Sequence, residues 1–150
     1  GKTAIVESIG ENLSFVENFK NYFILLVNPN VEISTREVFE NLNVKYISKK
    51  QTIFKSSHPK IDIDFIKKRD NVLQNFTVEK NKLIKDLLSF LSSCHGSLLT
   101  RMTGSGATCY SLFANKKDLE NAKKITVKTF KNYWIQDSTL VNSVEDIKLV

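Results

Sequence analysis

Five stretches of the chain are rich in branched and aromatic residues and are typical of β-strands. The clearest is YFILLVNP, an apolar run that stops at Pro29. Strands are predicted at 3–10, 22–29, 97–103, 108–114 and 133–140, and a tail follows the last of them.

Helical patterns separate these strands. Ser34 with Glu37 three residues later predicts a short helix that runs to about Leu42. A stripe of apolar residues at helical spacing between 78 and 91 predicts a helix that lies on a sheet. The stripe consists of Leu83, Ile84, Leu87, Leu88 and Leu91. Further helices are predicted at 61–71 and at about 115–132, the latter with Leu119, Ala122, Ile125 and Phe130 on its inner side.

This mixture of strands and helices predicts an α+β fold, in which helices cover one face of an antiparallel sheet. The expected topology is the split βαβ arrangement that is called ferredoxin-like. A chain of 150 residues is long enough for one compact domain, and a single domain over 1–150 is expected.

The composition is that of a globular protein, with 41% hydrophobic and 25% charged residues. The longest apolar run, YFILLV, is far below the roughly 18 residues of a membrane span, so no membrane association is expected. Cys94 and Cys109 are the only cysteines and form no C-x-x-C pair, so neither a zinc site nor a disulfide framework is indicated. The start of the chain shows no targeting pattern, and a cytoplasmic protein with reduced thiols is expected.

The formal net charge of +6 favours anionic partners without choosing among them. Lysines but no acidic residues lie between 41 and 61, which predicts an exposed basic connection whose simplest interpretation is a solvated loop. A second interpretation is a surface for single-stranded nucleic acid, with Tyr46 and Phe54 among the lysines, but the chain lacks an RNP-type aromatic motif. The lysines are Lys45, Lys49, Lys50, Lys55 and Lys60.

Other polar residues give weaker indications of chemistry. His58 and His95 have no second histidine at ligand spacing, so no metal site is expected and both are interpreted as surface residues. Nothing in the sequence places the acidic candidates in one pocket, and they are interpreted as solvated charges. These candidates are Glu7, Glu11, Asp62 and Asp64.

The segment at 103–108 holds two glycines around a serine. Glycine adopts positive φ freely, so successive N–H groups of such a loop can point at a phosphate, with hydroxyl donors from Thr103, Ser105 and Thr108. A lone G-x-G pattern is also typical of an ordinary hairpin turn, which these residues alone favour.

Three segments resemble the GHMP kinase superfamily in order and in rough spacing. LLTRMTGSGATCYSLFA resembles its third signature segment, with the pattern Met-Ser/Thr-Gly-Ser/Thr-Gly-Ala. AIVESIGE at 4–11 resembles its Val-Gly-Ile-Gly-Glu type of strand end. LLVNPNVEISTREVF at 25–39 resembles its Val-x-Pro-x-x-x-x-x-Thr-x-x-x-Phe segment. Together they cover most of 2–140.

The resemblance implies a small-molecule kinase, and the Thr-x-x-x-Phe segment favours the branch that acts on a cytidine-diphosphate-linked methylerythritol. Such an enzyme transfers the γ-phosphoryl group of ATP, with Mg²⁺, to the 2-hydroxyl of that substrate in non-mevalonate isoprenoid biosynthesis. Another kinase of the superfamily, acting on mevalonate derivatives or homoserine, is the nearest alternative. A ferredoxin-like module that binds a nucleotide or nucleic acid without catalysis is more distant.

The chain departs from the family in two ways. The family's Pro-x-x-x-Gly-Leu-Gly-Gly-Ser-Ser loop and its catalytic Lys and Asp belong to an N-terminal half, and none of the 5 glycines here builds that loop. The chain is therefore similar to the substrate-side C-terminal half. Its partner is expected to be the absent N-terminal domain, and alone it is expected to be inactive. The second departure is RDNVL at 69–73 in place of Asn-Asp-Leu, which leaves the roles of Asp70 and Asn71 open.

The resemblance also implies roles for residues of this chain. Phe39 is expected to stack on the cytosine ring, and Thr35, four residues earlier, to lie on the same side of the helix and donate a hydrogen bond. The alternative for Phe39 is an anchor in the core, a position that Val38 and Leu42 also suit. The glycine loop is expected to face the phosphates as a supporting wall of the active site. Its residues are Thr103, Gly104, Ser105, Gly106 and Ala107.

Overall fold

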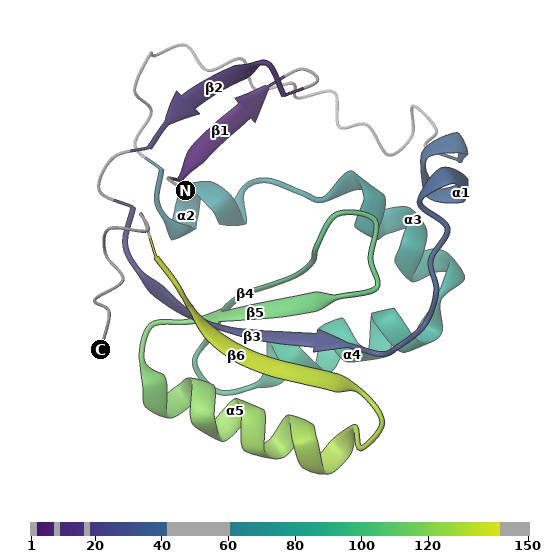
Figure 1. Ribbon diagram of the computed structural model, residues 1–150. Helices are drawn as coiled ribbons and strands as arrows, with labels where there is room; N and C mark the ends of the chain where they lie inside the picture. Colours follow the sequence, from purple (N-terminus) through teal and green to yellow (C-terminus); the bar gives the residue numbers. More distant parts are fainter. Residues whose placement is uncertain (1–2, 8–9, 17–18, 42–60, 142–150) are drawn as a thin grey trace.

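The computed structural model describes residues 3–7, 10–16, 19–41 and 61–141. The strands are β1 (Ala4–Glu7), β2 (Asn12–Phe15), β3 (Tyr22–Asn28), β4 (Ser97–Met102), β5 (Cys109–Phe113) and β6 (Trp134–Leu140). The helices are α1 (Thr35–Glu40), α2 (Ile63–Lys67), α3 (Val72–Lys80), α4 (Lys82–Ser93) and α5 (Lys116–Thr129). A four-stranded sheet in the order β4–β5–β3–β6 forms the centre, and β1 and β2 pair separately (Figure 1).

The central sheet confirms the predicted ferredoxin-like fold. All its neighbouring strands are antiparallel, so β3 and β4, which lie on either side of β5, run parallel to each other. The helices α1 to α4 connect these two strands. In the same way β5 and β6 lie on either side of β3 and are connected by α5. Each connection is thus a βαβ unit with another strand inserted, which is the split βαβ arrangement.

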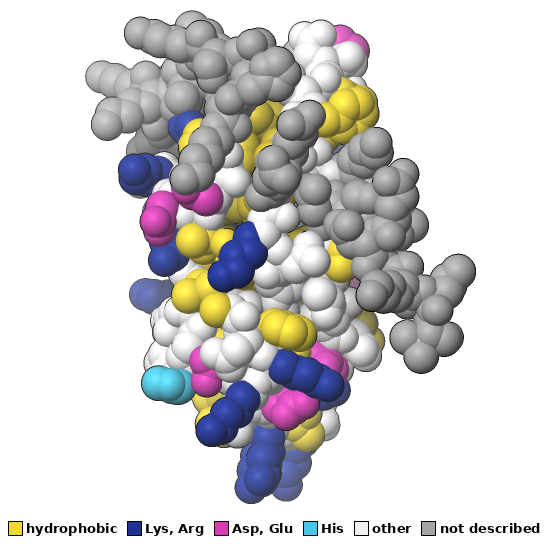
Figure 2. All heavy atoms as spheres, turned by 90° about the vertical axis from the view of Figure 1, so that its left-hand side faces the viewer, with side chains coloured by type: hydrophobic (Ala, Val, Ile, Leu, Met, Phe, Trp, Pro, Cys, Tyr) yellow, Lys and Arg dark blue, Asp and Glu magenta, His cyan; other side chains and the backbone are white. Residues whose placement is uncertain are grey.

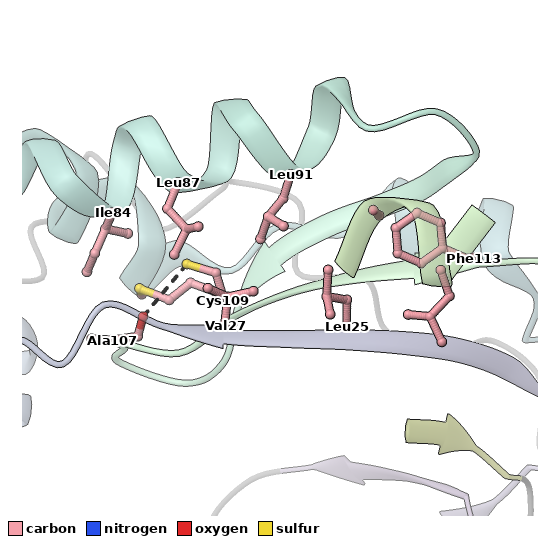
Figure 3. Close-up of a cluster of buried hydrophobic side chains, with 11 residues drawn as sticks. Leu25, Val27, Ile84, Leu87, Leu91, Ala107, Cys109 and Phe113 are labelled. Atoms are coloured by element: carbon pink, nitrogen blue, oxygen red, sulfur yellow. Dashed lines mark hydrogen bonds between the residues drawn. The ribbon is translucent and has the colours of Figure 1, made fainter. Parts of the chain in front are cut away.

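One face of the sheet packs against α4 and α5. Ile84, Leu87 and Leu91 point from α4 toward the strands, and none of the three has exposed surface (Figure 3). Leu119 and Ala122 of α5 belong to the same cluster. The cluster therefore joins both helices to the sheet. Its strand residues include Leu25, Val27, Cys109 and Phe113.

The opposite face of the sheet is buried by the segments around the β1–β2 hairpin and by α2. Leu112 of β5 belongs to a second cluster there, next to Phe113, which points to the helix side. Val16 and Phe19 close this cluster from the segment before β3, and Ile63 of α2 packs against it. A strand that is covered on both faces has no polar alternation, which explains why YFILLV is apolar throughout.

The boundaries of the helices predicted at 61–71 and 78–91 are wrong, because this part of the chain forms three helices, α2, α3 and α4, instead of two. The side chains of Asp62, Asn71 and Asn81 each accept a hydrogen bond from a backbone N–H two or three residues ahead. Each of them therefore caps the start of a separate helix. Asn81 also lies at the end of α3, so a pattern that suggests one helix contains two.

Two residues predicted on inner helix faces lie outside. Leu83 is 47% exposed and Ile125 is 51% exposed. In α5 the buried position belongs to Thr126, whose hydroxyl donates to the carbonyl of Ala122 at 2.7 Å and so is satisfied without water. The strand predicted at 3–10 ends at Glu7, and β2 was not predicted.

Charged side chains of both signs lie on the surface over α5, at the lower end of Figure 2. Lys123 and Asp137 form an ion pair at 2.5 Å that joins α5 to β6. The hydrogen bond from Lys123 is the main reason why the pKa of Asp137 is lowered. Of the helices that the structure describes, none is long and apolar enough to cross a membrane. The basic stretch at 45–60 lies outside the described residues.

Replacing Leu87 by Ala should lower the free energy of unfolding by about 2–5 kcal/mol, because it opens a cavity in the sheet–helix cluster. The matched control is Leu83→Ala in the same helix, at a side chain that is 47% exposed, and it should change stability by about 0.5 kcal/mol. Urea denaturation of both variants tests this. Equal losses contradict the assignment of α4's inner face.

Candidate functional site

The glycine segment is the turn of the β4–β5 hairpin. The N–H of Thr103 donates to the carbonyl of Thr108 at 2.8 Å, and the N–H of Gly106 donates to the carbonyl of Thr103 at 3.0 Å. Gly104 and Gly106 have φ values of 50° and 105°, in the region that favours glycine. The backbone hydrogen bonds are therefore those of a hairpin turn. A role in facing phosphates requires N–H or hydroxyl donors that these bonds leave unused.

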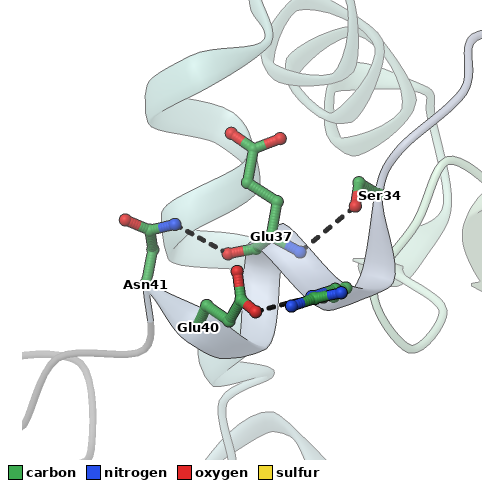
Figure 4. Close-up of polar contacts among 5 residues, drawn as sticks. Ser34, Glu37, Glu40 and Asn41 are labelled. Carbon is green, nitrogen blue, oxygen red and sulfur yellow. Dashed lines mark hydrogen bonds and ion pairs between the residues drawn. The ribbon is translucent and has the colours of Figure 1, made fainter.

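The helix α1 begins as the capping pattern predicts. The hydroxyl of Ser34 accepts from the N–H of Glu37 at 3.2 Å, and the amide of Asn41 donates to the carbonyl of Glu37 at the other end (Figure 4). Val38 is the buried residue of this short helix, whereas Phe39 is 58% exposed. The interpretation of Phe39 as a core anchor is therefore wrong, since Val38 fills that role.

A hydrogen bond joins the two segments in which site residues were predicted. The hydroxyls of Thr35 and Ser105 lie 2.8 Å apart, although the two residues are separated by 70 positions in the sequence. Thr35 is the first residue of α1, and Phe39 follows it by one turn. The exposed aromatic ring and the glycine turn are thus carried by elements that contact each other directly.

The unused donors of the turn lie next to this contact. Among the described residues no acceptor binds the N–H of Ser105, or that of Gly104. One hydroxyl hydrogen is used between Thr35 and Ser105, so one more remains free to donate. This arrangement offers peptide and hydroxyl donors to an anion, which is the chemistry that phosphate recognition needs.

Three side chains of the α3 region hold the turn from behind. The amide of Asn71 donates to the carbonyls of Met102 and Gly104, at 3.0 and 2.9 Å. The N–H of Met102 donates to the side-chain oxygen of Gln74 at 2.8 Å. The hydroxyl of Thr77 lies 3.5 Å from the carbonyl of Ser105. The sequence did not reveal these contacts, because their partners are backbone atoms and leave no pattern of residue types.

A pocket of about 230 Å³ lies between α1 and α3. Its walls combine carboxylates, one lysine and apolar residues, so it has no single chemical preference. Phe39, Thr35 and Ser105 are not among its lining residues, but the pocket adjoins the Thr35–Ser105 contact through Ser34 and Thr77. The lining residues are Glu32, Ile33, Ser34, Glu37, Val38, Phe76, Thr77, Lys80 and Asn81.

The remaining candidates do not assemble into a second site. The side chain of His95 is 92% exposed and lies 3.9 Å from Asp118, which confirms its position at the surface. Asp62 caps α2, and Asp64 lies 3.8 Å from Lys67. His58 lies outside the described residues. Within the described ranges, no three His, Cys, Asp or Glu side chains are placed to share a metal ion.

Both cysteines are free thiols. Burial raises the pKa of Cys109 to about 12, and burial also raises the pKa of Cys94. Because the thiolate is the reactive form, this raised pKa and the complete burial of Cys109 both argue against a role as a nucleophile. It packs on the helix side of the sheet with Val27, in the cluster of Figure 3.

Comparison with known proteins relates the chain to kinases. Residues 61–132 match the family model described as GHMP kinases C terminal. A 4-diphosphocytidyl-2-C-methyl-D-erythritol kinase of Clostridium botulinum strain Langeland is 35% identical over 116 residues, which are 75% of this chain and 41% of the relative. The enzyme of that name from Clostridioides difficile strain 630 is 30% identical over 149 residues, 93% of this chain and 48% of the relative.

Solved structures agree on the fold. The crystal structure of a 4-(cytidine 5'-diphospho)-2C-methyl-D-erythritol kinase superposes with a TM-score of 0.64 at 13% identity, over 89% of this chain and 48% of that one. The L. major mevalonate kinase in complex with R-mevalonate gives 0.54 at 14% identity, over 93% and 48%. The chain spans about half the length of the relatives that it matches.

Replacing Gly106 by Ala should destabilise the protein by about 3 kcal/mol, because φ is unsuited to a side chain and the new Cβ must compress its surroundings. That Cβ would lie 2.8 Å from the sulfur of Met102, at a φ of 105°. At Gly104 the φ is 50° and nothing lies within 4 Å of a Cβ, so Gly104→Ala should cost only about 1 kcal/mol. Thermal unfolding of both variants distinguishes them, and a larger loss at Gly104 contradicts the turn geometry.

Proposed function

We propose that the chain is the substrate-side part of a small-molecule kinase, because residues 61–132 match the family model described as GHMP kinases C terminal. The substrate is a cytidine-diphosphate-linked methylerythritol, and the complete enzyme phosphorylates its 2-hydroxyl with ATP. The names of the relatives from Clostridium botulinum and Clostridioides difficile support this choice of substrate. Another substrate of the superfamily is the alternative.

The contact between Thr35 and Ser105 is the observation that carries the proposal. A cytidine diphosphate has an aromatic base at one end and phosphates at the other. The exposed ring of Phe39 offers a stacking surface to the base, and the turn offers donors to the phosphates. Since stacking of a base on an aromatic side chain contributes about 1–3 kcal/mol, Phe39 is a sufficient anchor for the cytosine.

The residues of this chain bind and orient the substrate, and the transfer step needs groups that the N-terminal half supplies. In that step a bond forms between the substrate's 2-hydroxyl oxygen and the γ-phosphorus, the bond from the γ-phosphorus to the bridging oxygen breaks and releases ADP, and the hydroxyl proton passes to a base of the N-terminal half. ATP with Mg²⁺ supplies the phosphoryl group. Positioning and charge stabilisation account for most catalysis of this type. The N–H of Ser105 and the neighbouring hydroxyls contribute to it by holding negatively charged oxygens.

The N-terminal half is also the proposed partner of the β1–β2 hairpin. Val6 and Leu13 are opposite each other in the hairpin and are 60% and 54% exposed. Phe15 lies on the same face, two residues from Leu13, and is 61% exposed. A small hairpin rarely exposes three large apolar side chains on one face without a partner. The N-terminal half of the relatives, which this chain does not span, is the proposed cover for this surface.

Cytidine 5'-diphosphate should bind this chain, and Phe39→Ala should weaken the binding about tenfold or more through loss of stacking. The matched control is Phe15→Ala, because Phe15 and Phe39 are similarly exposed, at 61% and 58%. Backbone amide shifts recorded during titration measure both affinities. Equal losses in the two variants contradict the base site. Binding only to single-stranded DNA, with a steep salt dependence, favours the nucleic-acid interpretation instead.

Kinase activity should be absent from the chain alone and present when the N-terminal half of the Clostridium botulinum kinase is fused ahead of Gly1. The measurement is ADP release in the presence of the cytidine-diphosphate-linked methylerythritol. Phosphorylation by the isolated chain contradicts the proposal that the N-terminal half supplies the catalytic groups. A folded fusion protein that binds ATP but gives no turnover contradicts the proposed function.

A further inference from the structure

We infer that Asn71 is a positioning residue that turns the Ser105 N–H toward the substrate. The phosphate-facing role of Ser105 rests on the proposed function. The hydrogen bonds between Asn71 and the turn are observed in the structure and do not depend on it. Asn71 lies in the RDNVL segment, where the family pattern is displaced and no role follows from resemblance.

The side chain of Asn71 makes three hydrogen bonds at once. Its oxygen accepts from the N–H of Leu73 at 3.1 Å and so caps α3. Its nitrogen donates to the carbonyls of Met102 and Gly104, at 3.0 and 2.9 Å. The two carbonyls belong to the last residue of β4 and to the first glycine of the turn. One amide group therefore fixes the turn to the start of a helix.

This contact determines the direction of the next peptide group. In a trans peptide the carbonyl oxygen and the N–H point in opposite directions. The carbonyl of Gly104 points at Asn71, so the N–H of Ser105 points away from α3. No described residue accepts a hydrogen bond from it. If the Gly104–Ser105 peptide rotated, the carbonyl would replace the N–H on the open side and would repel a phosphate.

Helix capping alone does not explain this arrangement, and Asn81 shows the difference. Asn81 caps α4 by accepting from the N–H of Ile84 at 3.3 Å. Among the described residues its side-chain nitrogen donates to no carbonyl of the turn. The two asparagines thus share the capping role and differ in the donor contacts. Asn81 is a matched control for substitutions at Asn71.

The test compares Asn71→Asp and Asn71→Ser with the same changes at Asn81. Both Asp and Ser keep a capping acceptor, and neither provides the two amide donors. Hydrogen exchange of the Gly106 amide, which donates to the carbonyl of Thr103 within the turn, reports on the order of the loop. We expect exchange at least about tenfold faster in both Asn71 variants and unchanged exchange in the Asn81 variants, with the protection of β3 unchanged in all four.

Inorganic pyrophosphate is the probe of the phosphate-facing role. In the unaltered chain it should shift the amide resonance of Ser105, and the neutral variant Asn71→Ser should raise the dissociation constant at least about tenfold while Asn81→Ser leaves it unchanged.

Three results decide between the inference and the proposed function. Unchanged Gly106 exchange in both Asn71 variants overturns the positioning role. Faster exchange of the Gly106 amide with unchanged pyrophosphate affinity also overturns it, because the turn then binds phosphate without the hydrogen bonds from Asn71. Absence of any pyrophosphate effect in the unaltered chain contradicts the phosphate-facing loop of the proposed function, while the exchange measurement still decides whether Asn71 holds the turn.

Discussion

Antiparallel pairing of β3 with β5 is the constraint on which the site depends. The register places Val27, near the end of β3, opposite Cys109, the first residue of β5. The chain that leaves β3 and the turn that enters β5 therefore emerge at the same end of the sheet. Asn28 strengthens this junction, because its side-chain nitrogen donates to the hydroxyl of Thr108 at 2.9 Å. The pairing thus brings the segment that leads to Thr35 and the turn that carries Ser105 to the same end of the sheet, where the two hydroxyls meet.

Stability of the sheet and geometry of the site are therefore coupled. The residues that fix the register, such as Leu25 and Phe113, have no exposed surface and pack under α4 and α5. A shift of one residue would move their side chains to the other face, so the core specifies the register strongly. The turn at the end of the hairpin is positioned by this rigid base, and contacts with α1 and the start of α3 orient its peptide groups. Sites that rest on such elements lose little entropy when they bind a ligand.

The sequence predicts the strands well and the helix boundaries poorly, for physical reasons. Strands that are buried on both faces are continuous apolar runs, and YFILLV has no competing interpretation as a surface element. By contrast, Asn81 looks the same in a helix interior and at a cap, and only the three-dimensional course of the chain decides between them. In α5 the apolar Ile125 is exposed while Thr126 is buried, because a local hydrogen bond to Ala122 satisfies the hydroxyl. Resemblance suggested Thr35 and the glycine turn, but Asn71 acts on backbone carbonyls, which no residue pattern records.

The exposure of Phe39 supports the proposal that a ligand covers its ring. A phenylalanine ring that is 58% exposed loses hydrophobic stabilisation that its neighbour Val38 obtains in the core. Phe39 follows Thr35 by one helical turn, and Thr35 contacts Ser105 of the turn, so the ligand proposed to reach both elements would be apolar at one end and anionic at the other. A nucleoside diphosphate meets both requirements, whereas a metabolite without an aromatic group leaves the ring in water. The exposed ring of Phe39 and the donors of the turn therefore support the proposal of a nucleotide-linked substrate.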